Sequence, residues 1–318
     1  MARSFKIGII GAGNIANKMA KTIKRLEGFE NYAISSRSLD KAEKFKGKYN
    51  FKVAYGSYED LVKDENVDLV YIATPHSCHY EQMKLCLKYK KPVLCEKTFT
   101  PYLEQTKDVL ENFEKEGVFI AEALWTSFMP SRDIINNLIK EKKIGNVKSM
   151  NATFKVPLTH KERVMKRNLG GGVLMDIGIY PVTFVLRTLG FNYLNYTVDD
   201  IVYKNDVDIK ETITFYYEND VKGTCFVDGS SNISMVVNII GDNGSIFIDI
   251  VNCPNIIVLK SKCGFVKHIY FTKPKYGGFE YELIACKKAI QDKKIEAKDW
   301  THDNTIAFAK IVEEILNK

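Results

Sequence analysis

The chain of 318 residues is long enough for two domains, and its 45% hydrophobic and 27% charged residues are typical of a globular protein with a substantial core. Its 46 Lys and Arg residues exceed its 39 Asp and Glu residues, but the two signs alternate along the chain, so nucleic-acid binding is not expected. Because the sequence has neither a continuous apolar run of about 18 residues nor a secretory leader, we expect a cytoplasmic protein without a membrane partner. Its seven scattered cysteines form no C-x-x-C pair, which favours reduced thiols.

The first part of the chain alternates strand and helix patterns with short connections. Apolar runs typical of buried parallel strands lie within residues 5–13, 31–38, 53–55, 67–75, 91–97 and 118–125. Helical spacing of apolar residues lies between them, within residues 14–26, 39–49, 58–66, 79–90 and 102–117. This alternation predicts an α/β domain with a doubly wound parallel sheet over residues 1–124.

After about residue 125 the pattern changes to long alternating strands. Strands are expected within residues 147–156, 207–219, 221–229, 234–250 and 255–271, and turns such as "GDNG" suit antiparallel hairpins. Helices are expected over residues 131–145, 170–190, 279–290 and 303–318. Residues 125–318 are therefore predicted to form an α+β domain with a mainly antiparallel, open sheet.

The stretch "GAGNIA" follows the first strand and opens the first helix. Gly11, Gly13 and Ala16 have the G-x-G-x-x-G/A spacing of dinucleotide-binding turns, in which the backbone approaches a pyrophosphate at a helix N-terminus. We therefore expect Gly11, Gly13, Asn14 and Ile15 to contact a dinucleotide.

The tip of the second strand reads Ser35-Ser36-Arg37-Ser38. Enzymes specific for NAD usually carry an acidic residue here, whereas a guanidinium flanked by hydroxyls suits the 2′-phosphate of NADP. Ser36 and Arg37 thus predict NADP in preference to NAD, with Arg37 as a merely solvated charge the alternative.

Two further strand ends carry polar residues toward the expected ligand crevice. After the strand at 67–75, we expect the cofactor to lie beside Ala73, Thr74, Pro75, His76 and His79. A metal site of His76, Cys78 and His79 is not expected, because three ligands within four residues make poor tetrahedral geometry. The strand at 91–97 ends in an acidic and a basic residue, Glu96 and Lys97, and we expect both to face the cofactor as well.

The motifs "GAGNIA", "ISSR", "ATPHSCHYE", "LCEKTF", "AEALWTSFMP" and "GGGVLMDIGIYP" together resemble the Gfo/Idh/MocA oxidoreductases over essentially the whole chain. The resemblance extends to the branch of dimeric dihydrodiol dehydrogenase and NADP-dependent D-xylose dehydrogenase. It implies that Lys97 is the lysine that reaches the substrate beside the nicotinamide. Thr98 stands where the family carries proline, which removes one fixed φ angle from this loop.

The same resemblance implies the other site residues. Asp176 and Tyr180 are four apart on an expected helix and would lie on one face of it, with Tyr180 exchanging a proton and Lys97 stabilising its phenolate. Asp176 would either orient Lys97 or contact a substrate hydroxyl. Trp125 and Phe154 would form aromatic walls of the substrate pocket, although both residue types are also common in domain cores. Arg163, Arg167 and Asn168 precede the glycines and are further candidates for substrate contact.

The expected activity is reversible hydride transfer between NADP and a carbinol or carbonyl carbon of a sugar, another polyol or a trans-dihydrodiol. The alternatives are a non-catalytic dinucleotide-binding regulator or sensor and an NAD-dependent inositol-type dehydrogenase. By analogy with the family, we expect a homodimer formed through the C-terminal sheet.

Overall fold

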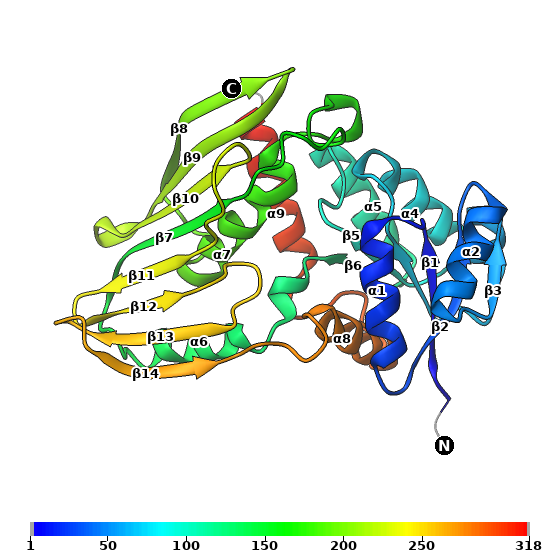
Figure 1. The fold of residues 1–318 in the computed structure, drawn as a ribbon, viewed down its shortest axis with the longest axis horizontal. Helices are drawn as coiled ribbons and strands as arrows, with labels where there is room; N and C mark the ends of the chain where they lie inside the picture. Colours follow the sequence, from blue (N-terminus) through cyan, green and yellow to red (C-terminus); the bar gives the residue numbers. More distant parts are fainter. Residues whose placement is uncertain (1–2, 317–318) are drawn as a thin grey trace. The chain divides into compact units, whose positions relative to one another are not determined.

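The computed structural model describes residues 3–316, which form two compact units (Figure 1). The first unit holds the chain up to Phe128 together with Tyr276–Glu313, and the second holds Met129–Lys275 with the chain from Glu314. The helix at 279–291 and residues 302–313 of the last helix therefore group with the first unit, although the change of sequence pattern assigns both helices to the domain at 125–318. A change in the spacing of apolar residues along the sequence marks where one sheet ends. It does not show with which unit a later helix packs.

The first unit contains a six-stranded parallel sheet in the order β3-β2-β1-β4-β5-β6, which confirms the doubly wound fold. Its strands are β1 (Phe5–Ile10), β2 (Phe29–Ser35), β3 (Val53–Tyr55), β4 (Leu69–Ile72), β5 (Val93–Glu96) and β6 (Ile120–Ala123). The strand order reverses beside β1, and ligands bind at such switch points, outside the carboxyl ends of the strands.

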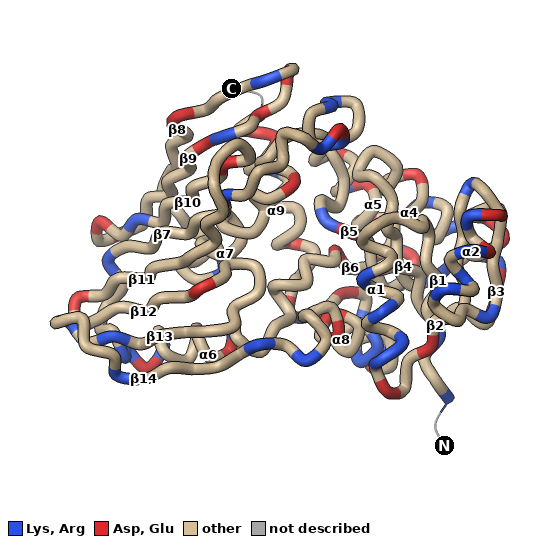
Figure 2. The backbone as a smooth tube through the Cα atoms, viewed as in Figure 1, with Lys and Arg blue, Asp and Glu red and all other residues tan. Residues whose placement is uncertain are grey.

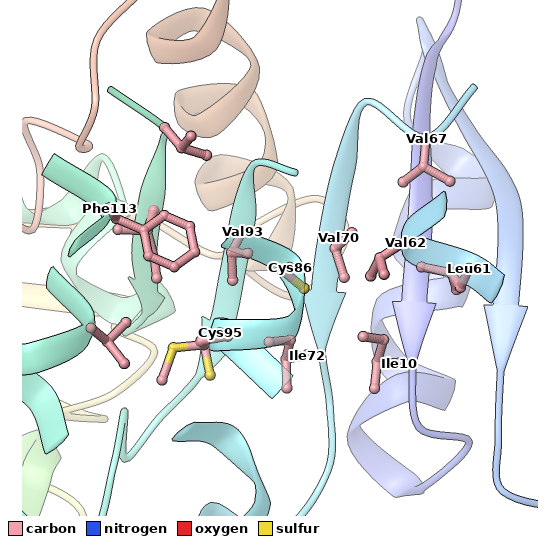
Figure 3. Packing of buried hydrophobic residues seen from close by; sticks show 14 of the residues in the cluster. Ile10, Leu61, Val62, Val67, Val70, Ile72, Cys86, Val93, Cys95 and Phe113 are labelled. Carbon is pink, nitrogen blue, oxygen red and sulfur yellow. The ribbon is translucent and has the colours of Figure 1, made fainter. Parts of the chain in front are cut away.

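Helices connect and cover these strands. They are α1 (Asn14–Arg25), α2 (Leu39–Tyr49), α3 (Tyr58–Lys63), α4 (His79–Lys88) and α5 (Leu103–Lys115), with short η1 (His76–Cys78) and η2 (Trp125–Phe128), and α8 (Phe279–Gln291) and α9 (His302–Leu316) later in the chain. On one face, strand residues such as Val70, Ile72 and Val93 pack against α3, α4 and α5 (Figure 3). Burial on both faces explains why these strands read as continuous apolar runs.

The second unit is built on an eight-stranded sheet in the order β14-β13-β12-β11-β7-β10-β9-β8. Neighbouring strands are antiparallel except for the parallel pair β7 and β10. Its strands are β7 (Val147–Lys155), β8 (Asn195–Lys204), β9 (Val207–Tyr216), β10 (Lys222–Asp228), β11 (Val237–Gly241), β12 (Gly244–Ile248), β13 (Ile256–Ser261) and β14 (Val266–Phe271). The sheet confirms the mainly antiparallel prediction. The edge strand β8 was not expected, because most of its residues are exposed and its apolar pattern is weak.

The other elements of this unit are α6 (Ser131–Lys140), α7 (Ile179–Leu189), η3 (Arg167–Leu169), η4 (Leu174–Gly178) and η5 (Glu218–Asp220). The segment Arg167–Leu189 is long and apolar enough to cross a membrane by composition, but 83% of its most apolar window is buried inside the protein. The segment is therefore buried as a core helix of the second unit, in which α7 packs on β7 and β10. Lys and Arg alternate with Asp and Glu along both units, as the sequence indicates (Figure 2).

Candidate active site

The turn between β1 and α1 has the geometry that dinucleotide binding requires. Gly11 has φ of +100°, and a Cβ there would lie 3.0 Å from the Ala73 carbonyl oxygen, so this position favours glycine. Gly13 caps α1, and a Cβ at this position would lie 3.9 Å from the same oxygen, which leaves open space beside the backbone. Asn14 and Ile15 form the first turn of the helix, whose N-terminus favours an anionic group. The residues present therefore fit a pyrophosphate.

The tip of β2 presents an exposed guanidinium. Arg37 is exposed, whereas Ser35 and Ser36 are buried and the Ser36 hydroxyl accepts a hydrogen bond from the Ser38 backbone N–H at 3.4 Å. Burial raises the pKa of the Tyr58 phenol at the start of α3, and the charge of Arg37 lowers it. The tip thus exposes the Arg37 guanidinium, whereas the Ser35 and Ser36 side chains are buried.

The segment after β4 contains His76 and His79, whose side chains have different surroundings. Ala73 and His76 are buried, Pro75 is exposed, and the Thr74 hydroxyl donates to the Gln82 side chain at 2.6 Å. The imidazole of His79 is fully buried, with Nε2 3.0 Å from the Thr74 carbonyl oxygen and Nδ1 3.1 Å from that of Phe99.

His79 therefore links the loop after β4 to the loop after β5. Burial lowers the pKa of this imidazole, against the carbonyl contacts that raise it. Both ring nitrogens face the backbone, so the geometry favours loop positioning over the cofactor contact expected for His79 from the sequence. His76 lies in η1, which follows the end of β4, and its ring centroid is 5.7 Å from that of His79.

The end of β5 brings Glu96 and Lys97 to the same edge of the sheet as Gly11 and Ala73. Lys97 is half-buried, and it is joined by a cis peptide bond to Thr98, the residue in place of the family proline. Glu96 is buried and points into the unit, where its carboxylate accepts hydrogen bonds from the Tyr71 hydroxyl and the Lys97 backbone N–H.

The environment of Lys97 is acidic. Burial raises the pKa of Glu96 to about 7, although the bond from Tyr71 and the charge of Lys97 lower it. Burial also raises the pKa of Glu122, whose carboxylate accepts bonds from the Phe99 backbone N–H at 3.0 Å and Trp300 Nε1 at 2.9 Å. The charge of Lys97 lowers the pKa of Glu122 as well, so this lysine acts electrostatically on two buried carboxyl groups.

The second unit contributes an aromatic pair. The rings of Phe154 on β7 and Tyr180 on α7 stack with centroids 5.3 Å apart and an interplanar angle of 21°. Both residues are buried, at 5% and 8% exposure. The structure thus places two of the residues expected at the substrate pocket against each other, within one unit.

Asp176 belongs to a π-helical turn, Leu174–Gly178, that precedes α7. Its buried carboxylate forms an ion pair with the guanidinium of Arg163, with both oxygens 2.9 Å from Arg163 Nη2. Because the turn is wider than an α-helical one, the four-residue spacing from Asp176 to Tyr180 is not that of a regular helix face. The backbone N–H of Leu174 donates to buried Asp208 at 2.6 Å, which holds the start of the turn.

The remaining candidates are Trp125, Arg167 and Asn168. Trp125 in η2 belongs to the first unit, where its ring stacks on Phe279 of α8 at 5.0 Å. Arg167 and Asn168 form part of the short helix η3 in the second unit and are exposed. Sequence reasoning missed Tyr71 and Glu122, although an acid inside the apolar run 118–125 is a recognisable signal for the latter.

Two surface hollows of the first unit lie elsewhere and include none of these strand ends. One hollow is bordered by Tyr55 and Lys63 near α3, and the other lies between α4 and α5 beside Lys84 and Asp108. The residues expected to contact the cofactor therefore line neither hollow.

A parallel sheet with a glycine turn at its switch point, joined to a second α+β unit, defines a dinucleotide-dependent oxidoreductase as the class of protein. The sequence pattern of the family described as "Oxidoreductase family, NAD-binding Rossmann fold" matches residues 5–123. The pattern described as "GFO/IDH/MocA C-terminal domain" matches residues 134–247. The chain belongs to the Gfo/Idh/MocA oxidoreductase family, as its motifs indicate.

Its relatives include named dehydrogenases. The trans-1,2-dihydrobenzene-1,2-diol dehydrogenase of Mus musculus is 32% identical over 258 residues, covering 80% of this chain and 78% of the relative. The enzyme of the same name from Danio rerio is 28% identical over 315 residues, covering 96% and 94%. The chain is thus an NAD(P)-dependent dehydrogenase by family.

Solved structures share the fold over nearly the whole chain. A 3-ketoreductase from Actinomadura kijaniata, in complex with NADP and TDP-benzene, is similar with a TM-score of 0.87 at 21% identity, covering 98% of this chain and 96% of that one. An aldose-aldose oxidoreductase from Caulobacter crescentus, complexed with glycerol, is similar with a TM-score of 0.88 at 19% identity, covering 99% and 97%. At these identities the similarity shows the fold.

Proposed function

We propose that this protein is an NADP-dependent dehydrogenase that interconverts a carbinol and a carbonyl on a trans-dihydrodiol or a sugar. The observation that carries the proposal is the stacked pair of Phe154 and Tyr180, which offers a flat aromatic wall and a phenol together. Such a wall suits an unsaturated ring or the apolar face of a pyranose. Relatives named as dihydrodiol dehydrogenases support the first of these substrate classes.

In this proposal Lys97 and Tyr180 act on the same substrate oxygen. Tyr180, as phenolate, accepts the hydroxyl proton during oxidation, and the Lys97 ammonium stabilises the negative charge on both oxygens. During reduction the same phenol donates its proton to the carbonyl oxygen. Asp176, held by Arg163, orients a second substrate hydroxyl by accepting its hydrogen bond.

The cofactor supplies, when bound, the acceptor or donor of the hydride. Gly11, Gly13 and the first turn of α1 would hold the pyrophosphate, as the open cradle at Gly13 and the tight turn at Gly11 favour. The segment from Ala73 to His76 and the end of β5 would border the nicotinamide half. Arg37 and Ser36 would hold the 2′-phosphate that distinguishes NADP from NAD.

Replacing Arg37 by alanine is expected to reduce the preference for NADP over NAD by about 2 kcal/mol, the size of a charge-assisted hydrogen bond. The affinity for NAD should change little, because NAD has no 2′-phosphate. Titration of both cofactors, followed by protein fluorescence, measures the two affinities. Lys41→Ala, on the exposed surface of α2, is the control and should leave the preference unchanged. An unchanged preference in Arg37→Ala contradicts the assignment of this site.

A panel of trans-dihydrodiols, aldoses and polyols, read by NADPH absorbance, tests the activity itself. We expect turnover on at least one of these classes with NADP. A wild-type protein that binds NADP but turns over none of them would identify a sensor or regulator instead.

We also propose that two copies associate through the open face of the second sheet. In the strand register, the side chains of Phe247, Val258 and Ile269 lie in one row across β12, β13 and β14, with Phe271 nearby at 80% exposure. Uncovered apolar rows of this kind are typical of interfaces between copies.

The free thiols of Cys86, Cys95 and Cys225 support a reducing, cytoplasmic location.

Ile269→Glu is expected to convert a dimer to a monomer, because it places a charge within this apolar row. Ile284→Glu on α8 is a matched control, since Ile284 and Ile269 are similarly exposed at 46% and 43%. Light scattering during gel filtration measures both masses. A wild-type monomer, or a dimer that survives the change at Ile269, would refute this interface.

A further inference from the structure

The second unit contains a buried aspartate that the proposed reaction does not use. Asp208 lies in β9, is 2% exposed, and its Oδ2 accepts a hydrogen bond from the backbone N–H of Leu174 at 2.6 Å. Its Oδ1 lies against Gly172, where a Cβ would come within 2.1 Å of this oxygen. Asp208 therefore contacts both the first residue of the π-helical turn Leu174–Gly178 and the residue two places before it.

The local backbone explains why an aspartate fits here. The first N–H groups of a helix have no partner within the helix, and a carboxylate oxygen can accept from them. Burial raises the pKa of Asp208, against hydrogen bonds from backbone N–H groups, those of Leu174 and Val173 among them, that lower it. Gly172 has φ of +110° and carries no side chain that would collide with the carboxylate. Asp208 thus caps the π-helical turn from a neighbouring strand.

The glycines before the turn join it to the loop that carries Arg163. The Gly172 N–H donates to the Val164 carbonyl oxygen at 2.9 Å, and the Asp176 N–H donates to the Gly172 carbonyl oxygen at 3.3 Å. A Cβ at Gly171 would lie 2.6 Å from the Val164 carbonyl oxygen and 3.0 Å from that of Arg163, so the loop closes around this glycine. The loop and the turn therefore form one hydrogen-bonded assembly that includes both Arg163 and Asp176.

The ion pair within this assembly fixes the direction of a hydrogen-bond acceptor. Arg163 Nη2 lies 2.9 Å from both carboxylate oxygens of Asp176. The side chain of Asp176 is 7% exposed and that of Arg163 is 44% exposed, so the acid is held by a cation that reaches the surface. A carboxylate has about four acceptor sites, so the same group can accept from Arg163 and from a substrate hydroxyl. Its direction depends on where the turn is held.

We propose that Asp208 is a positioning residue for Asp176 and thereby sets the selectivity of the enzyme for vicinal diols over simple alcohols. It holds the π-helical turn where Asp176 accepts the hydrogen bond of the hydroxyl next to the reacting carbinol. The inference rests on the proposed function, in which Asp176 orients a second substrate hydroxyl. Both proposed substrate classes, trans-dihydrodiols and sugars, carry such a hydroxyl. Asp208 itself contacts neither substrate nor cofactor in this proposal.

Asp208→Asn tests this role, because asparagine keeps the volume but replaces one acceptor oxygen with an NH2 donor. The measured quantity is kcat/KM for trans-cyclohexane-1,2-diol divided by kcat/KM for cyclohexanol, both with NADP. For a sugar dehydrogenase the corresponding pair is D-glucose and 2-deoxy-D-glucose, which lacks the hydroxyl next to the reacting carbon. The variant should lower this ratio by about tenfold, the effect of weakening one hydrogen bond to a charged group. A general loss of folded protein lowers both values together and leaves the ratio unchanged.

Asp249→Asn is the matched control in the same unit. Asp249 also accepts hydrogen bonds from backbone N–H groups, those of Asn255 and Ile256, each at 3.0 Å. Its ratio should equal that of the wild type. Asp176→Asn should lower the ratio at least as far as Asp208→Asn, and the double variant should lower it no further, because both residues act through one acceptor. An unchanged ratio in Asp208→Asn, or losses that multiply in the double variant, would overturn the proposal.

Urea unfolding tests the same coupling without turnover. Asp208→Asn, Arg163→Gln and the double variant form a double-mutant cycle, and we expect a coupling of about threefold or more in the folding equilibrium constant. Effects that multiply without coupling would show that Asp208 does not hold the loop of Arg163, and would also overturn the proposal. Absence of turnover on every substrate would instead refute the proposed function. The cycle then still decides whether Asp208 positions the Arg163–Asp176 pair.

Discussion

Replacing Lys97 by methionine is expected to lower kcat by about 10³-fold, or about 4 kcal/mol in the activation barrier. Methionine keeps the length and apolar stem of the side chain but removes the ammonium that would stabilise the phenolate and the reacting oxygen. Stopped-flow measurement of the first turnover isolates this step from product release. The affinity for NADP, measured by fluorescence, should remain close to that of the wild type.

The change at Lys97 also removes the charge that lowers the pKa of Glu96 and Glu122. The pKa of both carboxyl groups should rise further, so the variant should be less stable at high pH than at neutral pH. Lys84→Met, on the exposed surface of α4, is the control for the loss of a lysine and should keep full turnover. A kcat for Lys97→Met within tenfold of the wild type would exclude a direct role for this ammonium.

Tyr180→Phe is expected to lower kcat by about 10²-fold to 10³-fold with little effect on folding. Phenylalanine preserves the stacking on Phe154 and removes only the hydroxyl, so the loss measures proton transfer apart from the aromatic wall. Steady-state kinetics with the substrate found in the panel gives kcat and KM separately. The KM should change less than kcat, because the wall that contacts the ring remains.

Tyr217→Phe provides the comparison in the same unit. Tyr217 is also buried, and its hydroxyl donates to the Gly190 carbonyl oxygen at 2.9 Å. Its loss should reduce stability by about 1 kcal/mol and leave kcat unchanged. Similar kcat values for Tyr180→Phe and Tyr217→Phe would remove Tyr180 from the proposed mechanism.

Local patterns were sufficient for much of the fold and for the cofactor turn. The glycine positions, the helix start at Asn14 and the continuous apolar strands follow from short-range rules, because backbone conformation and burial on both faces restrict which residues occur. The exposed Arg37 at the tip of β2 could likewise be predicted, since strand ends follow directly from strand positions. Resemblance to the family, rather than periodicity, led to Asp176 and Tyr180.

Other features depend on contacts between distant segments. The bond from Tyr71 to Glu96 joins neighbouring strands, and the Arg163–Asp176 ion pair joins a loop to a π-helical turn that a regular helical pattern does not predict. Glu282 lies on the same helical face as Leu283 and Cys286, so the sequence shows an acid on an apolar face. It does not show that α8 packs into the first unit and brings this acid to Glu96.

The sequence by itself thus determined the two kinds of sheet and the glycine turn, and its resemblance to the family supplied the residues proposed to carry the chemistry. Tertiary structure decided which of them are buried, which carbonyls surround His79, and which buried acids the charge of Lys97 acts on. The physical reason is range: backbone preferences act over a few residues, whereas desolvation and charge interactions depend on every segment packed around a group.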